Sequence, residues 1–295
     1  MPYPIVPELS FEFFPPSSTS ASLRLWRAVE RLAPLNPKFV SVTYGAGGTT
    51  RERTYSAIMT IRDRARLNIA GHLTCVDATR DDVLDVAQKY RSMGVNHIVA
   101  LRGDPPKGED AFQQVEGGYG SAVELVRGLS EMGGFDVSVA AYPEKHPEAS
   151  SLACDIDNLK RKLDAGASRA ITQFFFDNAD FLRFRDEAAK AGITAPIVPG
   201  VLPIENFSKM VSFAGRCHAR VPDWMHDAFA NARSLEDAEL LATSICADQC
   251  DDLCREGVEH LHFYTLNNPD LTYDVCRAIG VSPSGISLAA SADVA

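Results

Sequence analysis

Short apolar runs alternate with longer amphipathic stretches along almost the whole chain. The runs are rich in β-branched and aromatic residues and stop at polar, glycine or proline residues, which is typical of buried strands. The predicted strands cover residues 9–13, 39–43, 69–74, 95–101, 135–141, 169–174, 196–200 and 260–265. Strands that alternate with helical stretches in this way predict an α/β fold with a parallel sheet.

Helical periodicity is found between the predicted strands. In the first helix, Leu23, Trp26, Val29 and Leu32 recur at steps of three and predict its buried face. The predicted helices cover about residues 21–32, 50–66, 80–93, 121–132, 151–165, 179–191 and 270–279, with a further helix starting near 205. Two extra helices, near 223–230 and 235–255, are predicted between the seventh and eighth strands.

The strands end at regular distances along the chain. Their tips are Glu12, Thr43, His72, Asp104, Tyr142, Gln173, Gly200 and Tyr264. Successive tips are 27 to 38 residues apart, except for 64 residues before the last. Eight such units predict a (β/α)8 TIM barrel, whose site forms at the C-terminal ends of the strands. We expect one domain over residues 1–281 and a disordered tail over 282–295.

Composition narrows the class of protein. The 295 residues, 45% of them hydrophobic, suffice for a barrel with insertions. A net charge of −10 argues against nucleic acid or an anionic membrane as partner. We find neither a signal peptide nor a stretch of the roughly 20 apolar residues that a membrane span needs. Seven scattered cysteines favour reduced thiols in the cytoplasm.

Two carboxylates at strand tips are candidates for catalysis. Glu12 stands among three phenylalanines, so we expect burial to raise its pKa until it can act as a general acid; the alternative is a surface carboxylate. Asp104 is either a second active carboxylate or a cap for the loop before two prolines. Arg102 could pair with Asp104 or bind a phosphate.

The helix over 151–165 carries a polar face. Asp155, Asn158 and Lys162 stand at i, i+3 and i+7 within one sector, and Arg161 flanks them. Such a face is either simply solvated or a set of hydrogen-bonding groups for ribose and phosphate.

Neighbouring strand tips add further polar and aromatic groups. Tyr142, His146 and His72 could extend the same site, although lone histidines are more often structural. Gln173 precedes three phenylalanines and could recognise the amide edge of a heterocycle.

Two other patterns are weaker. The glycine-rich segment 45–50 resembles an incomplete dinucleotide fingerprint, and we interpret it as a turn that lets the backbone approach a ligand. Cys246, Cys250 and Cys254 recur every four residues, which favours the small apolar face of a core helix over a metal site. We predict no bound metal.

Several long segments together resemble the methylenetetrahydrofolate reductase family, in the form of its bacterial catalytic barrel. The similarity runs from about residue 9 to 281. The segments are SFEFFPP (10–16), KFVSVTYGAGGTTRERT (38–54), GHLTCVDAT (71–79), HIVALRGDPP (97–106), VSVAAYPEKHPEA (137–149), DNLKRKLDAGASRAITQFFFD (157–177) and HFYTLNNP (262–269). Asn268 departs from the family, which usually has arginine there to help hold the folate.

The resemblance implies a barrel that binds FAD without a Rossmann fold. NADH or NADPH would reduce the flavin, which would then reduce 5,10-methylenetetrahydrofolate to 5-methyltetrahydrofolate in a ping-pong sequence. Glu12 would be the acid that opens the folate ring, Asp104 would stabilise the resulting cation, Gln173 would bind the pterin, and Phe207 would stack on nicotinamide or aminobenzoate. The implied FAD contacts are Thr43, His72, Arg102, Gly103, Asp104, Tyr119, Tyr142, His146, Asp155, Asn158, Arg161 and Lys162. Family members often form homo-oligomers.

Three alternative functions remain open. A flavin barrel could act as a dehydrogenase on another small substrate, such as an amino acid. A flavin-free barrel could be a folate-binding subunit of a larger redox complex. A lyase or aldolase is less favoured because no lysine stands at a strand tip.

Overall fold

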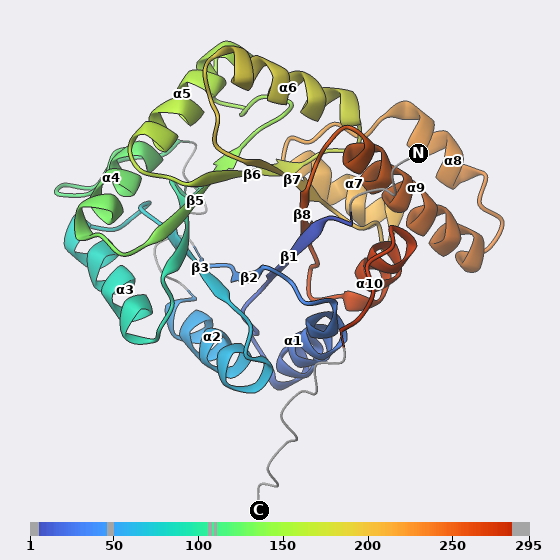
Figure 1. Cartoon of the computed structure of the whole chain (residues 1–295), viewed down its shortest axis with the longest axis horizontal. Helices are drawn as coiled ribbons and strands as arrows, with labels where there is room; N and C mark the ends of the chain where they lie inside the picture. Colours follow the sequence, from blue (N-terminus) through green and yellow to red (C-terminus); the bar gives the residue numbers. More distant parts are fainter. Residues whose placement is uncertain (1–5, 46–49, 106–107, 109–110, 285–295) are drawn as a thin grey trace, which may run out of the picture.

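Eight parallel strands close into a barrel in the computed structural model, which describes residues 6–45, 50–105, 108 and 111–284. The strands pair in sequential order, and β8 pairs with β1 to complete the ring. Figure 1 looks into this ring and shows the helices around its outside. The predicted (β/α)8 fold is confirmed.

The elements agree with the prediction to within a few residues. The strands are β1 (Glu8–Phe13), β2 (Phe39–Val42), β3 (Ile69–Thr74), β4 (His97–Leu101), β5 (Asp136–Ala141), β6 (Arg169–Phe174), β7 (Ile197–Val201) and β8 (His260–Tyr264). The helices are α1 (Thr19–Leu32), the 3-10 helix η1 (Ala33–Leu35), α2 (Arg51–Ala65), α3 (Arg80–Ser92), α4 (Ala122–Met132), α5 (Leu152–Asp164), α6 (Asn178–Lys190), α7 (Phe207–Arg216), α8 (Asp223–Ala230), α9 (Leu235–Arg255) and α10 (Pro269–Ala278).

Hydroxyl side chains determine where several helices begin. Ser121 and Ser151 each accept a hydrogen bond from a backbone N–H in the first turn, of α4 and α5 respectively. Thr79 and Asp82 form a reciprocal capping box at the start of α3. These caps place the helix starts next to the C-terminal ends of the strands, where the cavities described below open.

Side chains alternate between the inside and the outside of the barrel along β1. Leu9, Phe11 and Phe13 belong to the large core between strands and helices. Ser10 and Glu12 instead contact side chains from other strands, inside the ring. This two-residue period is the geometric property of a strand that divides the two layers.

The buried face of α1 differs from the prediction. Leu23 is 68% exposed, whereas Leu25, Ala28, Val29 and Leu32 are buried. Steps of three residues drift around a helix that has 3.6 residues per turn, while the observed i, i+3, i+4, i+7 spacing stays on one side. The predicted helix was right and its first face residue was wrong.

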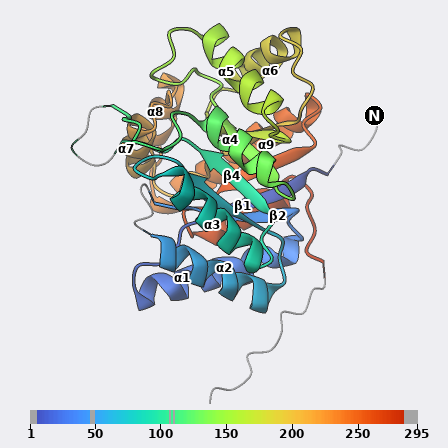
Figure 2. The same ribbon diagram turned by 90° about the vertical axis from the view of Figure 1, so that its left-hand side faces the viewer.

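Three helices lie between β7 and β8. The predicted extra helix α9 is in fact a helix of the ring, because it contacts α6 and α10 and buries Cys246, Cys250 and Leu253 in the main core, whereas α7 and α8 are the additional pair. Figure 1 shows α7, α8 and α9 together beside β7 and β8, and Figure 2 shows α7 and α8 at one end of the barrel. Cys246 and Cys250 are buried in α9, which confirms their predicted role in a core helix. Among the described residues, no group of histidine, cysteine and carboxylate side chains could hold a metal ion.

The first residues of the predicted tail are attached to the barrel. The backbone N–H of Ser284 donates to the carbonyl oxygen of Pro34, so residues 282–284 are held in place; residues 285–295 lie outside the described part. The single-domain assignment stays a prediction. Within the described ranges, every helix is too short or too polar to cross a bilayer.

We expect the substitution of leucine by alanine to destabilise the protein much more at a buried position of α9 than at an exposed one. Leu253→Ala should lower the free energy of unfolding by about 2–5 kcal/mol, because Leu253 is fully buried and truncation leaves a cavity. Leu240→Ala, at a position 63% exposed on the same helix, should change it by no more than about 0.5 kcal/mol. Urea unfolding of both variants measures the difference, and equal effects would contradict this packing of α9.

Candidate active site

Two adjoining cavities open at the C-terminal ends of the strands. The outer cavity has a volume of about 650 Å³ and lies over β4, β5 and α5, while the inner cavity of about 350 Å³ reaches into the barrel beside β1 and β8. Both are lined by Tyr44, Leu101, Asp104, Ala140, Tyr142 and Gln173. The shared walls make them two parts of one site.

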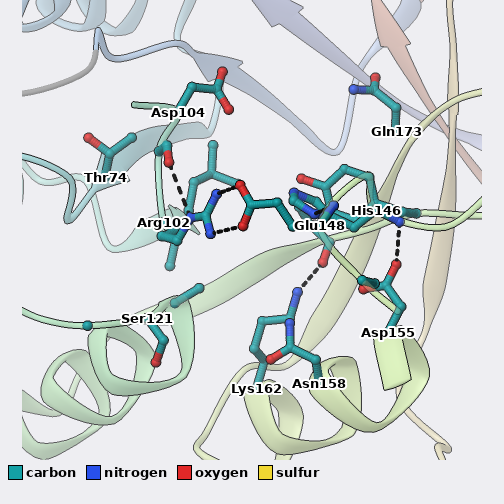
Figure 3. Close-up of a pocket in the computed structure, with 18 of the residues that line it drawn as sticks. Thr74, Arg102, Asp104, Ser121, His146, Glu148, Asp155, Asn158, Lys162 and Gln173 are labelled. Atoms are coloured by element: carbon teal, nitrogen blue, oxygen red, sulfur yellow. Dashed lines mark hydrogen bonds and ion pairs between the residues drawn. The ribbon is translucent and has the colours of Figure 1, made fainter. Parts of the chain in front are cut away.

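Arg102 is the main cation of the outer cavity. Its guanidinium donates two hydrogen bonds to the carboxylate of Glu148, at 2.5 and 2.7 Å, as Figure 3 shows. The pair raises the pKa of Arg102 and lowers that of Glu148. Asp104, at the exposed end of the strand tip, is therefore not its partner, and the alternative of Arg102–Asp104 pairing is wrong. Glu148 occupies the position where Arg102 would meet an anionic ligand.

The predicted polar face of α5 does line the outer cavity. Asp155 accepts a hydrogen bond from the backbone N–H of His146 at 2.7 Å, Asn158 lies one turn further on, and the Nζ of Lys162 donates to the carbonyl oxygen of Ala140. Burial lowers the pKa of Lys162 to about 8, although Asp155 opposes the shift. Figure 3 shows these side chains around the same space as Arg102.

Arg161 does not belong to this face. Its side chain is 60% exposed and pairs with Asp157 at 3.2 Å, and it lines neither cavity. An i, i+3, i+7 set shares one sector of a helix, and a residue adjacent to Lys162 in sequence is turned by about 100° from it. Only three of the four predicted residues of α5 are brought together.

The loop after β5 contributes an aromatic wall. The rings of Tyr142 and His146 meet edge to face, with centroids 4.6 Å apart, and both line the outer cavity. Burial raises the pKa of Tyr142 to about 12 and lowers that of His146, so both groups tend towards their neutral forms. Tyr142 and His146 thus lie on the one loop between β5 and α5, next to the polar face of α5.

Gly103 lets the backbone pass close to β3. Its φ is +90°, and a Cβ atom there would lie 2.4 Å from Cγ1 of Val76, which no side chain permits.

Tyr119 was expected in the same site but lies behind the wall of the outer cavity. It is 5% exposed, and its hydroxyl lies against Gly128. Arg80 rests over its ring at 5.1 Å. Tyr119 therefore packs against the middle of α4 and lines neither cavity.

Glu12 lies at the bottom of the inner cavity between two imidazoles. Its Oε2 is 3.3 Å from Nε2 of His72 and 4.0 Å from Nε2 of His262, and all three side chains are buried. Nε2 of His72 makes no aligned hydrogen bond with any described residue. The carboxylate of Glu12 thus has two imidazoles as its nearest charged or chargeable neighbours.

The pKa of Glu12 is lowered, whereas the sequence predicted a raised one. Burial raises it, as expected, but the two imidazoles of His262 and His72 outweigh burial and lower it to about 2. The sequence interpretation included the phenylalanines and omitted the histidines. His262 was missed, although the alternation of His260, His262 and Tyr264 on β8 was a signal that three polar side chains point into the barrel.

Of the remaining predicted residues, some line one or both cavities and others line neither. Thr43 lines the inner cavity, and Gln173 lines both while its Oε1 accepts the backbone N–H of Phe174. Phe207 lines neither, because its ring stacks on Phe229 at 4.2 Å. Phe213, one and a half turns further along α7, lines the inner cavity instead.

Two loop features are partly visible. The backbone N–H of Gly45 donates to the hydroxyl of Thr50 at 2.7 Å, and residues 46–49 of the predicted glycine-rich turn lie outside the described part. Asn268 precedes α10 without a side-chain cap and lines neither cavity.

Comparison with known proteins gives a consistent result. The family model described as methylenetetrahydrofolate reductase matches residues 6–280. The chain is 49% identical to the 5,10-methylenetetrahydrofolate reductase of Pectobacterium carotovorum and 48% identical to that of Escherichia coli, in each case over 93% of this chain and 91% of the relative. A solved structure from Clostridium thermocellum, described as an uncharacterized protein that binds two copies of 5-methyl-5,6,7,8-tetrahydrofolic acid, superposes with a TM-score of 0.59 at 14% identity, covering 93% of this chain and 95% of that one. That likeness shows the fold alone.

We expect two half-buried histidines, His97 and His260, to make stability depend on pH. Burial lowers the pKa of His260 to about 3 and that of His97 to about 4, while an unfolded histidine titrates near 6.5. Between these values the unfolded chain binds protons that the folded chain does not, so the free energy of unfolding falls as the pH falls. The slope is at most about 1.4 kcal/mol per pH unit for each proton.

His260→Gln removes the side chain that binds one of these protons in the unfolded chain. Urea unfolding of the variant between about pH 6 and about pH 4 should therefore give a shallower loss of stability than the unsubstituted protein. An unchanged slope would contradict a neutral, half-buried His260.

Proposed function

The chain belongs to the methylenetetrahydrofolate reductase family and is an oxidoreductase, and on this premise we propose that it reduces 5,10-methylenetetrahydrofolate to 5-methyltetrahydrofolate with electrons from NADH or NADPH, carried by bound FAD. The observation that best supports the proposal is the pairing of the two cavities. One carries a cation and hydrogen-bonding groups for a nucleotide cofactor, and the other buries a carboxylate beneath apolar walls.

The outer cavity fits the polar half of FAD. Arg102 supplies the charge that a diphosphate requires, and the backbone at Gly103 leaves room for close approach. Asp155 and Asn158 supply a carboxylate and an amide for hydroxyl groups, and Lys162 adds a buried donor. FAD, when bound, supplies a carrier that accepts two electrons from one substrate and gives them to the other.

Other groups extend the proposed FAD contacts. Tyr142 and His146 would flank the cofactor in the outer cavity, and Thr43 and His72 would meet it where the inner cavity begins. Tyr119 and Arg161 rest on the resemblance alone, because they lie away from both cavities.

In this proposal Glu12 protonates the folate and opens its imidazolidine ring to a cation. The low pKa of Glu12 means that its carboxylate is ionised before reaction, so it must receive a proton from a neighbouring group before it can pass one to the substrate. Asp104 would stabilise the cation, and Gln173 would hold the pterin by its amide edge. The apolar walls around Glu12, including Phe174 and Phe213, would exclude water from the reacting atoms.

A single inner cavity supports ping-pong kinetics. At about 350 Å³ it can seat one substrate ring beside the cofactor, so the pyridine nucleotide and the folate must take turns. Phe213 is positioned to stack on either ring, while the proposed stacking by Phe207 rests on the resemblance. The cytoplasmic location and homo-oligomeric assembly expected above remain part of the proposal, and sedimentation analysis tests the second.

The spectrum of the anaerobic protein tests the proposal. A flavin absorbance that bleaches with NADH or NADPH and returns with methylenetetrahydrofolate supports it. Protein that shows no flavin spectrum and is not reconstituted by FAD favours the flavin-free folate-binding subunit. Flavin that is reduced by a pyridine nucleotide but not reoxidised by the folate favours a dehydrogenase for another substrate.

We expect Glu12→Gln to separate the two half-reactions. Flavin reduction by NADH should continue, because it needs no acid, while reoxidation by methylenetetrahydrofolate should slow by about 10²- to 10⁴-fold. Glu8→Gln, at the opposite end of the same strand, is the matched control and should leave both unchanged. Stopped-flow absorbance follows each step, and a variant that keeps both would remove Glu12 from the role of acid.

We expect Arg102→Met to weaken FAD binding. Loss of a charged hydrogen-bonding group costs about 1.5–3 kcal/mol, or roughly 10- to 150-fold in Kd, and leaves Glu148 without its partner. Arg127→Met, at an exposed position of α4 that does not line the outer cavity, is the matched control and should leave the affinity unchanged. Titration of the flavin-free protein by fluorescence measures both, and equal losses would place the phosphate site elsewhere.

A further inference from the structure

A column of polar side chains runs down the inside of the barrel from Glu12. Nδ1 of His262 lies 2.7 Å from the hydroxyl of Ser10, and the same hydroxyl lies 2.9 Å from Nε2 of His260. Ser10 is fully buried and His262 is 1% exposed, whereas His260 is partly exposed at the first residue of β8. The column therefore begins at the proposed acid and ends at the N-terminal face of the barrel.

Strand register holds the column together. In the parallel pairing of β1 with β8, Ser10 is the partner of His262 and Glu8 is the partner of His260. Phe39 of β2 stacks on the His262 ring at 5.9 Å and meets the His260 ring edge to face at 5.8 Å, which closes the column on its third side. The hydroxyl of Ser10 is thus confined between two ring nitrogens.

The charged neighbours differ at the two ends. His262 faces Glu12 on β1, His72 on β3 and Tyr264 on its own strand. His260 is near Lys38, which precedes β2, and also near His97 on β4 and Arg169 on β6. The two cations beside His260, Lys38 and Arg169, disfavour a proton on its ring, and the carboxylate beside His262 favours a proton there.

We propose that His262, Ser10 and His260 form a proton path that refills Glu12 from the N-terminal face of the barrel. This inference rests on the proposed function, in which each turnover consumes one proton at Glu12. The mouth of the inner cavity is then covered by cofactor and substrate, so water cannot supply that proton from above. The column leads to the opposite face and bypasses the covered mouth.

The transfer is balanced in protons and moves no electrons. His262 gives the proton on Nε2 to the carboxylate of Glu12 and takes one on Nδ1 from the hydroxyl of Ser10. Ser10 in turn takes the Nε2 proton of His260, and His260 takes one from water at its exposed side. Each ring ends as the opposite tautomer. After the product leaves, water in the open cavity protonates Nε2 of His262, the Nδ1 proton of His262 passes back through Ser10 to Nε2 of His260, and His260 returns its Nδ1 proton to water, which restores the starting tautomers. The 4.0 Å step from His262 to Glu12 closes through one water.

The barrel offers a matched control for this path. Nε2 of His97 lies 2.8 Å from the hydroxyl of Ser138, which is also fully buried inside the ring. This pair resembles the His260–Ser10 pair in chemistry and depth, but Arg169 contacts the same ring nitrogen and no described hydrogen bond connects it to Glu12. Ser138→Ala therefore has the packing cost of Ser10→Ala without cutting the column.

The test compares Ser10→Ala with Ser138→Ala in the flavin-loaded enzyme. We expect Ser10→Ala to leave reduction by NADH unchanged and to slow reoxidation by methylenetetrahydrofolate by about tenfold to a hundredfold, with a larger solvent deuterium isotope effect and a steeper dependence on pH. Ser138→Ala should change none of these. Equal rates and isotope effects in the two variants would overturn the proton path, while wild-type enzyme that is not reoxidised by the folate would overturn the proposed function instead.

A second measurement needs neither flavin nor folate. In the flavin-free protein, ¹⁵N NMR of the histidine rings should show that Glu12→Gln shifts the signals of both His262 and His260 and leaves that of His97 in place. When Ser10→Ala is also present, Glu12→Gln should no longer shift the His260 signal. The path would be overturned if Glu12→Gln left the His260 signal unshifted. It would also be overturned if the shift were equally large with and without the Ser10 hydroxyl. Both outcomes are independent of the substrate of the enzyme.

Discussion

Closure of the sheet between β1 and β8 is the constraint on which the site depends. The register sets Ser10 opposite His262 and Glu12 opposite Tyr264. A slip of one residue would turn Ser10 and Glu12 outward into the apolar layer that holds Phe11 and would leave a carboxylate unpaired among hydrocarbon side chains. The apolar outer face of β1 and the polar inner face therefore stabilise the same register, and the site is a consequence of that alignment.

The site tolerates its buried charges because each has a partner. Glu12 stands between two imidazoles, and Arg102 is held in a two-pronged pair by Glu148. The Arg102–Glu148 pair is adjustable, since Glu148 would leave Arg102 for a ligand with greater negative charge. The groups that pair within the site are thus the ones that would meet cofactor and substrate.

Polarity is divided between the two cavities in a way that suits two different tasks. The outer cavity gathers its polar groups from loops and from α5, where a helix face and a turn can be shaped around a large nucleotide. The inner cavity is built from side chains of the strands themselves, which a closed barrel holds rigidly. A cofactor needs many moderate contacts, whereas proton transfer needs a few groups at fixed distances, and the barrel supplies both side by side.

Local patterns in the sequence were sufficient for the elements, their order and most of the residues at the strand tips. Period-two and helical patterns, capping residues and the regular spacing of tips are properties of neighbouring residues, so they can be read without a fold. This is why the polar face of α5 was predicted, with Asp155, Asn158 and Lys162 together. The position of Arg161 was the exception, because proximity in sequence is not proximity on a helix surface.

Only the tertiary structure decided which groups meet and what their protonation is. Glu148 is 46 residues from Arg102, and His72 and His262 reach Glu12 from β3 and β8. The pKa of Glu12 follows the sum of desolvation and the nearby imidazoles, and the second term is invisible in the segment around residue 12. Long-range pairing through a closed sheet sets that sum, and no local pattern along the chain contains it.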